Sequence, residues 1–149
     1  NGSSVLPQTA KLIGTCRSFE PDVQDRVQQR LGEIAEGVAS AYGAQAQCHY
    51  TRLYPALLNH EQQALAVKEI VRNWLGEEGL KPAPQQMTAE DFAFMTQVCP
   101  GCLFRLGIRD PKHTASLHEC EFDFNDKATL YGSTLMVLIA LNRLKAVNA

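Results

Sequence analysis

The sequence predicts an α/β fold that consists of two incomplete pieces. Within about the first fifty residues, a strand pattern, a helix pattern and a second strand pattern follow one another, which is half of a split β-α-β layer. Such a half leaves sheet edges unpaired and buries too little area for independent stability. The rest of the chain ends in a helix that is apolar on most sides, which predicts that this helix belongs in the interior of a larger structure.

The first piece contains the two strand patterns and the helix between them. Residues 11–19 alternate between two faces, which predicts a strand. A helix begins with Pro21 in its first turn, and Gly43 closes it. Residues 45–50 alternate again and predict the second strand. The apolar positions of the helix recur every three or four residues: Val23, Val27, Leu31, Ile34, Ala35 and Val38.

The second piece begins with a connector and a helix. Asn59, with Gln62 three residues later, has the pattern of a capping box, so Asn59 is the expected N-cap. Gly76 or Gly79 ends this helix ahead of a linker that contains two prolines. The apolar stripe that we expect to be buried consists of Ala64, Val67, Ile70, Val71, Trp74 and Leu75.

Two further helices follow, with a strand-like stretch at residues 103–108 between them. Thr88 with Asp91 repeats the capping pattern and predicts the start of a short helix. The last helix is expected to start after residues 125–126 and to run to about Lys145.

Composition excludes several classes of function. The 14 basic residues are scattered and balanced by 16 acidic ones, so no basic face is visible for nucleic acid. The longest apolar run, residues 135–141, is far shorter than the roughly 20 residues of a membrane-spanning helix. The first residues lack the basic and apolar regions of a signal peptide. Five cysteines are an odd set that favours reduced thiols, and we therefore expect a cytoplasmic protein.

Two short motifs have both a functional and an incidental explanation. Residues 99–102, Cys-Pro-Gly-Cys, have the spacing of a redox pair. Here, however, Pro-Gly makes a turn ahead of a strand-like stretch, which favours two incidental thiols. Residues 1–3, Asn-Gly-Ser, match a glycosylation acceptor, which is a pattern common by chance.

One histidine stands in a context that suggests metal chemistry. His118 lies in an acidic and aromatic turn directly before the last helix, and neutral imidazole is the commonest nitrogen ligand of zinc. A functional site needs at least three protein ligands, however, and the other histidines are poorly placed. His49 is expected in a strand, His60 at a helix start and His113 in a loop. Spacing alone therefore favours a solvent-facing or hydrogen-bonded loop histidine.

Other charged residues also have structural explanations. Glu90 and Asp91 lie in a first helical turn, where carboxylates satisfy free amides and the helix dipole. The Arg17 guanidinium suits a substrate carboxylate, but pairing with a helix carboxylate explains it equally well. Glu77 and Glu78 are expected to be a solvated charge pair at a helix end.

Four stretches of the sequence together resemble the co-catalytic metallohydrolase family of aminoacylases, hippurate hydrolases and auxin-conjugate hydrolases. They are Gly14-Thr15-Cys16-Arg17-Ser18-Phe19, Ala89-Glu90-Asp91-Phe92, Phe104-Arg105-Leu106-Gly107-Ile108 and Leu117-His118-Glu119-Cys120-Glu121-Phe122-Asp123-Phe124-Asn125-Asp126. The resemblance covers nearly the whole chain. The sequence departs from the family where Glu119 and Cys120 replace the usual Ser-Pro after the histidine.

The resemblance implies the identity of the two pieces. Residues 1–52 are expected to be the second half of a ferredoxin-like dimerisation or lid domain. Residues 53–149 are expected to complete a zinc-peptidase-like α/β catalytic domain. The implied parent is a homodimeric amidohydrolase that cleaves N-acyl amino acids, such as hippurate-like substrates, with two divalent ions, zinc or manganese. The general base and the remaining ligands are expected upstream, so the chain looks like a fragment that is inactive alone and binds metal at most partially.

The resemblance also implies roles for individual residues. His118 is the expected metal ligand, and it closes the two-metal centre from the carboxyl-terminal side. Arg17 is expected to bind substrate, and Glu90 and Asp91 to support the metal cleft, while no catalytic residue is expected in this chain. The competing hypothesis is a non-catalytic dimerisation or binding module derived from that family. A redox protein built on residues 99–102 is a remote third.

Overall fold

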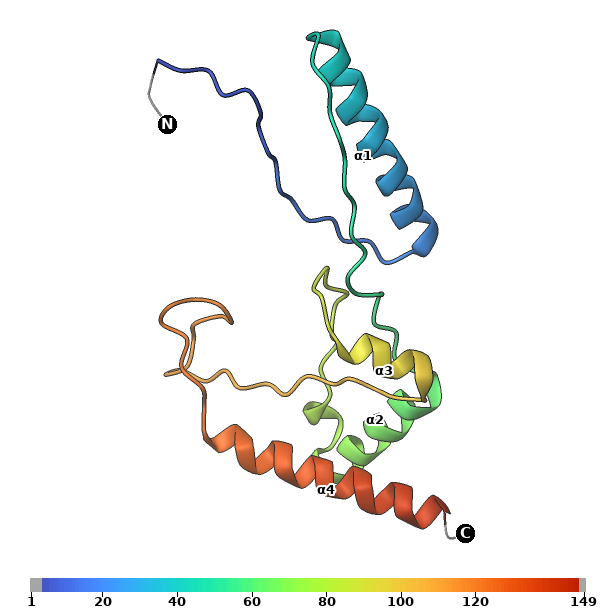
Figure 1. The fold of residues 1–149 in the computed structure, drawn as a ribbon. Helices are drawn as coiled ribbons and strands as arrows, with labels where there is room; N and C mark the ends of the chain where they lie inside the picture. The colour runs from blue at the N-terminus through green and yellow to red at the C-terminus, as the bar shows by residue number, and fades with distance from the viewer. Residues whose placement is uncertain (1–3, 148–149) are drawn as a thin grey trace. The chain divides into compact units, whose positions relative to one another are not determined.

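The computed structural model describes residues 4–147, so the glycosylation pattern at residues 1–3 lies outside the described residues. Figure 1 shows the helices in chain order. These are α1 (Pro21–Ala41), α2 (Glu61–Leu75), the short 3-10 helix η1 (Glu77–Gly79), α3 (Phe92–Val98) and α4 (Lys127–Val147). The chain divides into two compact units, residues 1–56 with 86–89 and residues 57–85 with 90–149. Each unit is described by itself.

The first unit contains α1 with an extended segment on each side of it. Proline occupies the first turn of α1, as predicted. At its carboxyl end, Gly43 adopts a φ of 67°, the left-handed conformation that glycine accepts without a steric penalty. The Gly43 amide donates to Ser40 O at 3.0 Å and the Ala44 amide to Ala39 O at 2.9 Å, which is the Schellman pattern. The predicted role of Gly43 is therefore confirmed.

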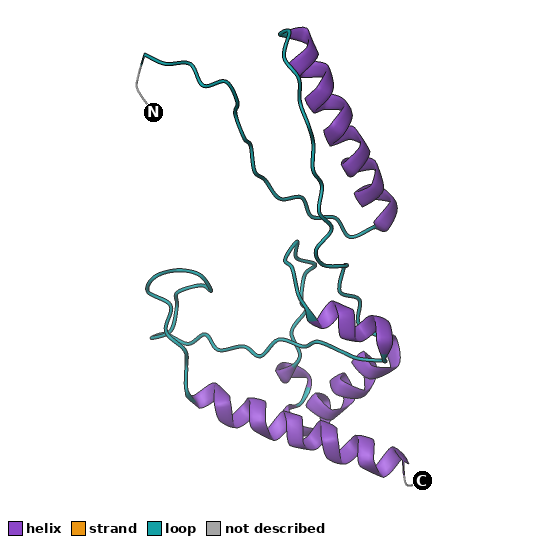
Figure 2. Ribbon diagram, viewed as in Figure 1, coloured by secondary structure: helices purple, strands orange, loops and turns teal. Residues whose placement is uncertain are grey.

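The prediction of strands at residues 11–19, 45–50 and 103–108 is wrong for this structure. These stretches run as loops in Figure 2, and no ladder forms among residues 4–147. A strand exists only when its N–H and C=O groups meet those of a neighbouring segment. Alternating side chains make a segment suitable for a sheet, but they do not provide the neighbouring segment with which it must pair.

A charged side chain ties the end of the first unit back to α1. Arg52 donates from Nη2 to Asp25 Oδ1 at 2.6 Å and from Nε to Gln28 Oε1 at 2.9 Å. The apolar face of α1 nevertheless has no cover, because none of its residues is buried. Val23, Leu31, Ile34 and Val38 are each more than two-fifths exposed. The apolar stripe that the sequence predicts is present on α1, but residues 4–147 supply no surface that buries it.

The second unit is held together at the start of α2 by two polar side chains. Asn59 Nδ2 donates to Leu103 O and Asn59 Oδ1 accepts from the Leu103 amide, both at 2.8 Å. His60 Nδ1 accepts from the Gly101 amide at 3.1 Å, while the His60 amide donates to Gly101 O at 3.0 Å. The predicted N-cap role of Asn59 is wrong, since His60 precedes α2 and no side chain caps it.

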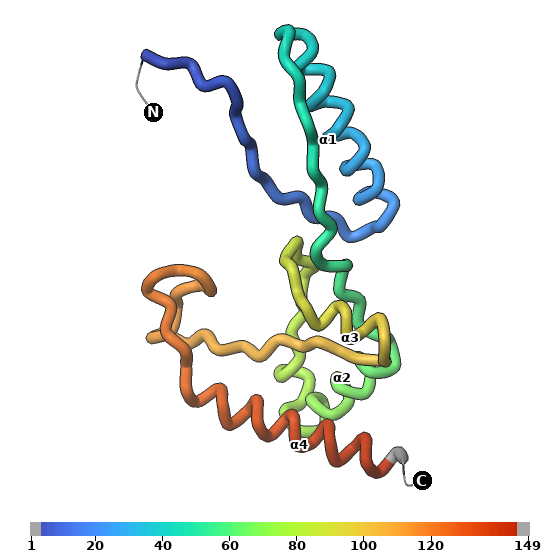
Figure 3. The backbone as a smooth tube through the Cα atoms, viewed as in Figure 1, coloured from blue at the N-terminus to red at the C-terminus, as the bar shows by residue number. Residues whose placement is uncertain are grey.

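The second unit has a small core, part of which forms where α2 packs against α4. Trp74 of α2 and Tyr131 of α4 pack with ring centroids 5.9 Å apart. Figure 3 shows the chain passing from α3 along residues 99–110 before it turns back into α4. The buried residues of the described chain are Val71, Ala93, Thr96, Ala128 and Leu135.

The starts of α3 and α4 differ from each other in how they are capped. Asp91 occupies the N-cap of α3 without a side-chain hydrogen bond, so the predicted pairing of Thr88 with Asp91 is wrong. For α4, the Lys127 amide donates to Asn125 Oδ1 at 3.2 Å, which agrees with the predicted start after residues 125–126.

The described helices leave much apolar surface uncovered. The accessible surface of 12939 Å² exceeds the roughly 9,000 Å² expected for two separately folded domains that divide this mass. On α4, the large apolar residues that are more than half exposed are Leu130, Met136, Val137, Leu141 and Leu144. This agrees with the prediction that α4 needs partners on most sides. No helix among the described residues is long and apolar enough to cross a membrane.

Candidate functional site

His118 lies in a loop of residues 110–125, which we call the His118 loop. Its side chain is exposed, and no hydrogen bond or ion pair joins its imidazole to another described residue. His118 has a φ of 73°, the one positive value of a non-glycine residue within residues 4–147. Such a conformation is uncommon for a side chain with a Cβ atom and persists only where the surroundings impose it. The His118 imidazole is therefore exposed, and it is attached to a residue with an uncommon backbone conformation.

The turn around His118 explains that conformation. The Glu119 amide donates to Ser116 O at 3.1 Å, which places His118 at the third position of a β-turn, where a type II turn requires a positive φ. The Glu119 carboxylate accepts from the Ser116 amide at 3.0 Å, and Arg109 donates to Ser116 Oγ at 3.3 Å. Glu119, which departs from the family pattern, thus has a partner inside the turn. The neighbouring Cys120 thiol lowers the pKa of Glu121 by hydrogen bonding.

A second set of contacts lies at the base of the loop. Asp110 Oδ1 accepts from the amides of Lys112 and His113, at 2.8 and 2.9 Å, and lies 2.7 Å from His113 Nδ1. Asp110 Oδ2 accepts from Asn125 Nδ2 at 3.1 Å. The His113 ring and these amides hold the pKa of Asp110 below its usual value. On its other side, His113 Nε2 is 3.8 Å from Asp123 Oδ2.

Sequence reasoning missed this cluster and assigned His113 only to a loop. The available signal was the order Asp110-Pro111-Lys112-His113, because an aspartate that precedes a turn often accepts from amides two and three residues on. The contact with Asn125 spans fifteen residues and has no local signature.

Glu90 and Asp91 lie at the start of α3 and have structural roles there. The half-buried Glu90 carboxylate accepts from the Phe92 amide at 3.4 Å. The main-chain oxygens of Glu90 and Asp91 accept from Ala93 and Phe94 at 3.2 and 3.0 Å. Within the described chain, no hydrogen bond or ion pair joins either carboxylate to the His118 loop. Their expected support of a metal cleft remains a prediction.

Arg17 belongs to the first compact unit, whereas His118 belongs to the second. Its guanidinium is exposed and donates to Thr15 Oγ1 at 3.3 Å within the same segment. The pairing of Arg17 with a helix carboxylate, which the sequence left open, is not found among the described residues. Its expected role toward substrate remains a prediction.

The two other motifs behave as structural features. Glu77 forms an ion pair with Arg72, which raises the pKa of that guanidinium, so the Glu-Glu doublet is tied to the end of α2. Cys99 Sγ lies 3.5 Å from Met95 O, and burial raises the pKa of Cys102. A raised pKa reduces the thiolate fraction, which is the opposite of what a redox cysteine needs.

Metal-binding side chains do not cluster within the part of the chain that the structure describes. No group of three or more histidine, cysteine, aspartate or glutamate side chains in residues 4–147 is arranged to hold a metal ion. His118 can therefore supply one ligand, but the described chain does not complete a site around it.

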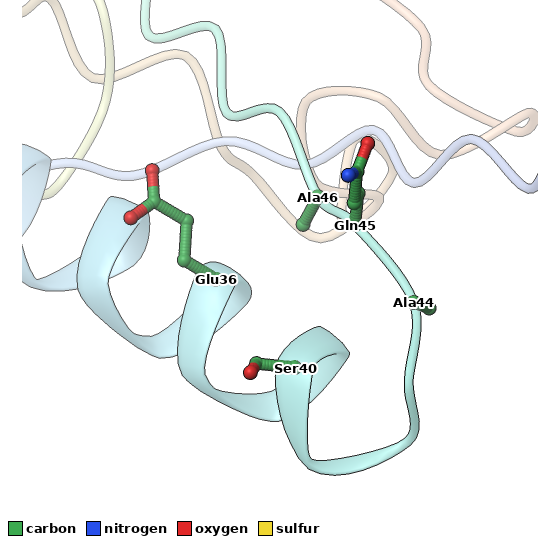
Figure 4. A pocket seen from close by; sticks show the side chains of 5 residues that line it. All are labelled: Glu36, Ser40, Ala44, Gln45 and Ala46. Carbon is green, nitrogen blue, oxygen red and sulfur yellow. The ribbon is translucent and has the colours of Figure 1, made fainter.

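A hollow in the first unit lies apart from all these residues. It is lined by Glu36, Ser40, Ala44, Gln45 and Ala46, at the carboxyl end of α1 and in the segment that follows (Figure 4). The hollow is shallow and open, and Glu36 supplies its one charged side chain. It contains none of the candidate residues.

Comparison with known proteins identifies a family that matches most of the chain. A family model described as peptidase family M20/M25/M40 matches residues 7–142. A putative amidohydrolase, YhaA of Bacillus subtilis, is 31% identical over 143 residues, which cover 95% of this chain and 36% of that protein. An N-acetyldiaminopimelate deacetylase of Enterococcus faecalis is 29% identical over 130 residues, which cover 87% of this chain and 33% of that protein. The chain spans about a third of the length of these relatives.

Proposed function

The chain belongs to the peptidase family M20/M25/M40, and from this premise we propose that it is the carboxyl-terminal portion of a metal-dependent amidohydrolase. The proposed substrates are N-acyl amino acids or related small amides, of the hippurate or aminoacylase type. Relatives that are named amidohydrolase and deacetylase support amide cleavage. The match over residues 7–142 carries the proposal.

The residues present fit a metal centre in one respect. His118 offers an exposed imidazole that has no partner among the described residues, so either ring nitrogen is free to bind an ion. When bound, two divalent ions, zinc or manganese, would polarise the scissile carbonyl and activate water. We propose that the remaining ligands and the glutamate that acts as general base come from residues outside 1–149. No catalytic residue is assigned to this chain.

The chain's own residues would bind one metal ion and the substrate carboxylate, and would support the cleft around them. His118 Nδ1 or Nε2 would hold one ion, in a turn whose backbone is already set. The exposed Arg17 guanidinium would pair with the carboxylate of an acyl amino acid. Glu90 and Asp91 would support the cleft through the start of α3 rather than by contact with the metal. These roles rest on the family resemblance.

The proposal also assigns the two pieces and their assembly. Residues 1–52 would belong to a ferredoxin-like lid domain, and residues 53–149 to the zinc-peptidase-like catalytic domain. Residues 11–19 are exposed and form no ladder with any other described residue, and Leu12 and Ile13 are more than four-fifths exposed, which supports pairing of two lid domains as a homodimer. All five cysteines are free, which supports a cytoplasmic location.

Hydrolysis of N-acyl amino acids by the product of the complete reading frame tests the proposal. The wild type should release free amino acid when it is loaded with zinc or manganese, and His118→Ala should lose nearly all of this activity together with bound metal. His49→Ala is the matched control, because His49 is also an exposed histidine without a recorded contact. Equal activity of the wild type and His118→Ala would remove His118 from the mechanism.

The alternative is a non-catalytic dimerisation or binding module. Replacement of the family's Ser-Pro by Glu119-Cys120 beside the candidate ligand is the observation that favours it. A folded and metal-loaded product without amidase activity on any N-acyl amino acid tried would support this alternative and reject the amidohydrolase. A reading frame that encodes no further metal ligands would also reject the amidohydrolase and support the non-catalytic module.

A further inference from the structure

Two polar contacts cross the His118 loop near its base, and the longer one joins His113 Nε2 to Asp123 Oδ2 at 3.8 Å. Asn125 Nδ2 donates to Asp110 Oδ2 at 3.1 Å, so the first and last residues of the loop meet. Compact surface loops of this length with adjoining ends are a recognised class of functional loop. In Figure 1 the loop is the orange curl that precedes α4.

Asp110 also orders the first turn of the loop. Its Oδ1 atom accepts from the amides of Lys112 and His113 and contacts the His113 ring. The adjacent Arg109 reaches Ser116, which opens the turn that contains His118. Two consecutive residues therefore hold the loop at its first turn, at its middle and at its end. The Asp110 side chain is 30% exposed, and the His113 side chain is 22% exposed.

We propose that Asp110 is a positioning residue, whose carboxylate closes residues 110–125 into a loop that presents His118 to a divalent cation. The ligand role of His118 rests on the proposed function, whereas the closure of the loop does not. A positive φ at a histidine is maintained only by its surroundings, and ordering a ligand before binding reduces the entropy lost on binding. Without the closing bond, the turn that contains His118 would be held less firmly relative to the rest of the loop.

An exchange of donor and acceptor isolates this contact. Asp110→Asn places an amide against the Asn125 amide, and Asn125→Asp places a carboxylate against Asp110. Asn125→Asp loses the closing bond, and Asp110→Asn can keep it only by turning one amide away from the backbone N–H groups that its oxygen accepts from. The double variant Asp110→Asn with Asn125→Asp restores it with the roles reversed, and the introduced carboxylate keeps an oxygen for the Lys127 amide at the start of α4. Asp126→Asn is the matched control, because the structure records no side-chain contact for Asp126 among the described residues.

The first readout is the rate of tryptic cleavage of the Lys112–His113 peptide bond, followed by mass spectrometry in the product of the complete reading frame. Cleavage requires the loop to open locally. We expect both single variants to be cut about threefold to tenfold faster, and the double variant and Asp126→Asn to be cut at the wild-type rate. Single variants that are cut no faster, or a double variant that is not restored, would overturn the closure by Asp110.

The second readout is zinc retained after dialysis against a chelator, with kcat and KM measured on the same samples. Each single variant should retain less zinc and lose kcat with little change in KM, and the double variant should recover both. If His118→Ala retains zinc as the wild type does, the proposed ligand role fails while the cleavage result still decides the closure. If the single variants loosen the loop but retain zinc fully, the loop is closed by Asp110 and the positioning role is rejected.

Discussion

Replacing Asn59 by alanine tests the contact that joins the start of α2 to residues 101–103. The Asn59 amide makes two hydrogen bonds of 2.8 Å to the backbone of Leu103, one as donor and one as acceptor. At about 1 kcal/mol for each net hydrogen bond, their loss should lower the free energy of opening at Leu103 by about 2 kcal/mol. The Leu103 amide should then exchange with solvent about thirtyfold faster in Asn59→Ala.

Amide hydrogen exchange read by NMR separates this role from the capping role that the sequence predicts. If Asn59 capped α2, the first amides of α2 would exchange faster in Asn59→Ala while Leu103 stayed protected. Asn73→Ala is the control, since Asn73 is exposed on the same helix without a recorded contact. Unchanged exchange at the Leu103 amide would refute the bond between Asn59 and Leu103. Faster exchange confined to the first amides of α2 would instead support the N-cap role that the sequence predicts for Asn59.

Three further predictions concern backbone and charge. Gly43→Ala should destabilise the protein by about 1 kcal/mol because of its positive φ, whereas Gly37→Ala, which enters open space in mid-helix, should stabilise it by about 0.5 kcal/mol in chemical denaturation. Gly101→Ala would bring a Cβ to 3.2 Å from an aromatic ring of α3 and should cost about 1 kcal/mol, while Gly107→Ala meets nothing within 4 Å and should be neutral. The lowered pKa of Asp110, caused first by the neighbouring imidazole and then by two backbone amides, means that its contribution to loop order is complete above the ordinary carboxyl pKa of about 3.9. That contribution should be lost as the pH falls through the lower folded value, and an NMR titration midpoint at or above the ordinary value would contradict this.

The helices could be predicted because their signals are local. Pro21 and Gly43 mark the ends of α1 through interactions within a few residues, and both act as the sequence predicts. Asn59 shows the limit of such reasoning, since its capping pattern is as good as any in the chain. Its amide instead bonds to Leu103, which is 44 residues away. The bond to Leu103 replaces the local capping bond, and the spacing of residues around Asn59 gives no sign of a partner so far along the chain.

The prediction of strands was wrong for a related reason. Residues 11–19 alternate as a strand should, but the fold of a strand is a property of a pair of segments. Among the described residues nothing supplies the second segment, and the apolar faces of α1 and α4 are exposed as well. The same shortage of neighbours therefore accounts for the missing ladders and for the excess accessible surface. A larger amidohydrolase, as proposed, would supply the missing neighbours.

Little of the candidate site could be predicted from spacing. His118 was singled out by resemblance, because a histidine in that acidic and aromatic context is typical of a family rather than of a spacing rule, and its role as a ligand remains a prediction. Its positive φ and the clamp at Asp110 came only from the structure. Glu119 illustrates why this matters: with Cys120 it replaces the family's Ser-Pro, and its carboxylate accepts from the Ser116 amide inside the turn. A substitution that removes proline's rigidity can thus preserve the presentation of His118, provided that hydrogen bonds from the loop itself take over the constraint.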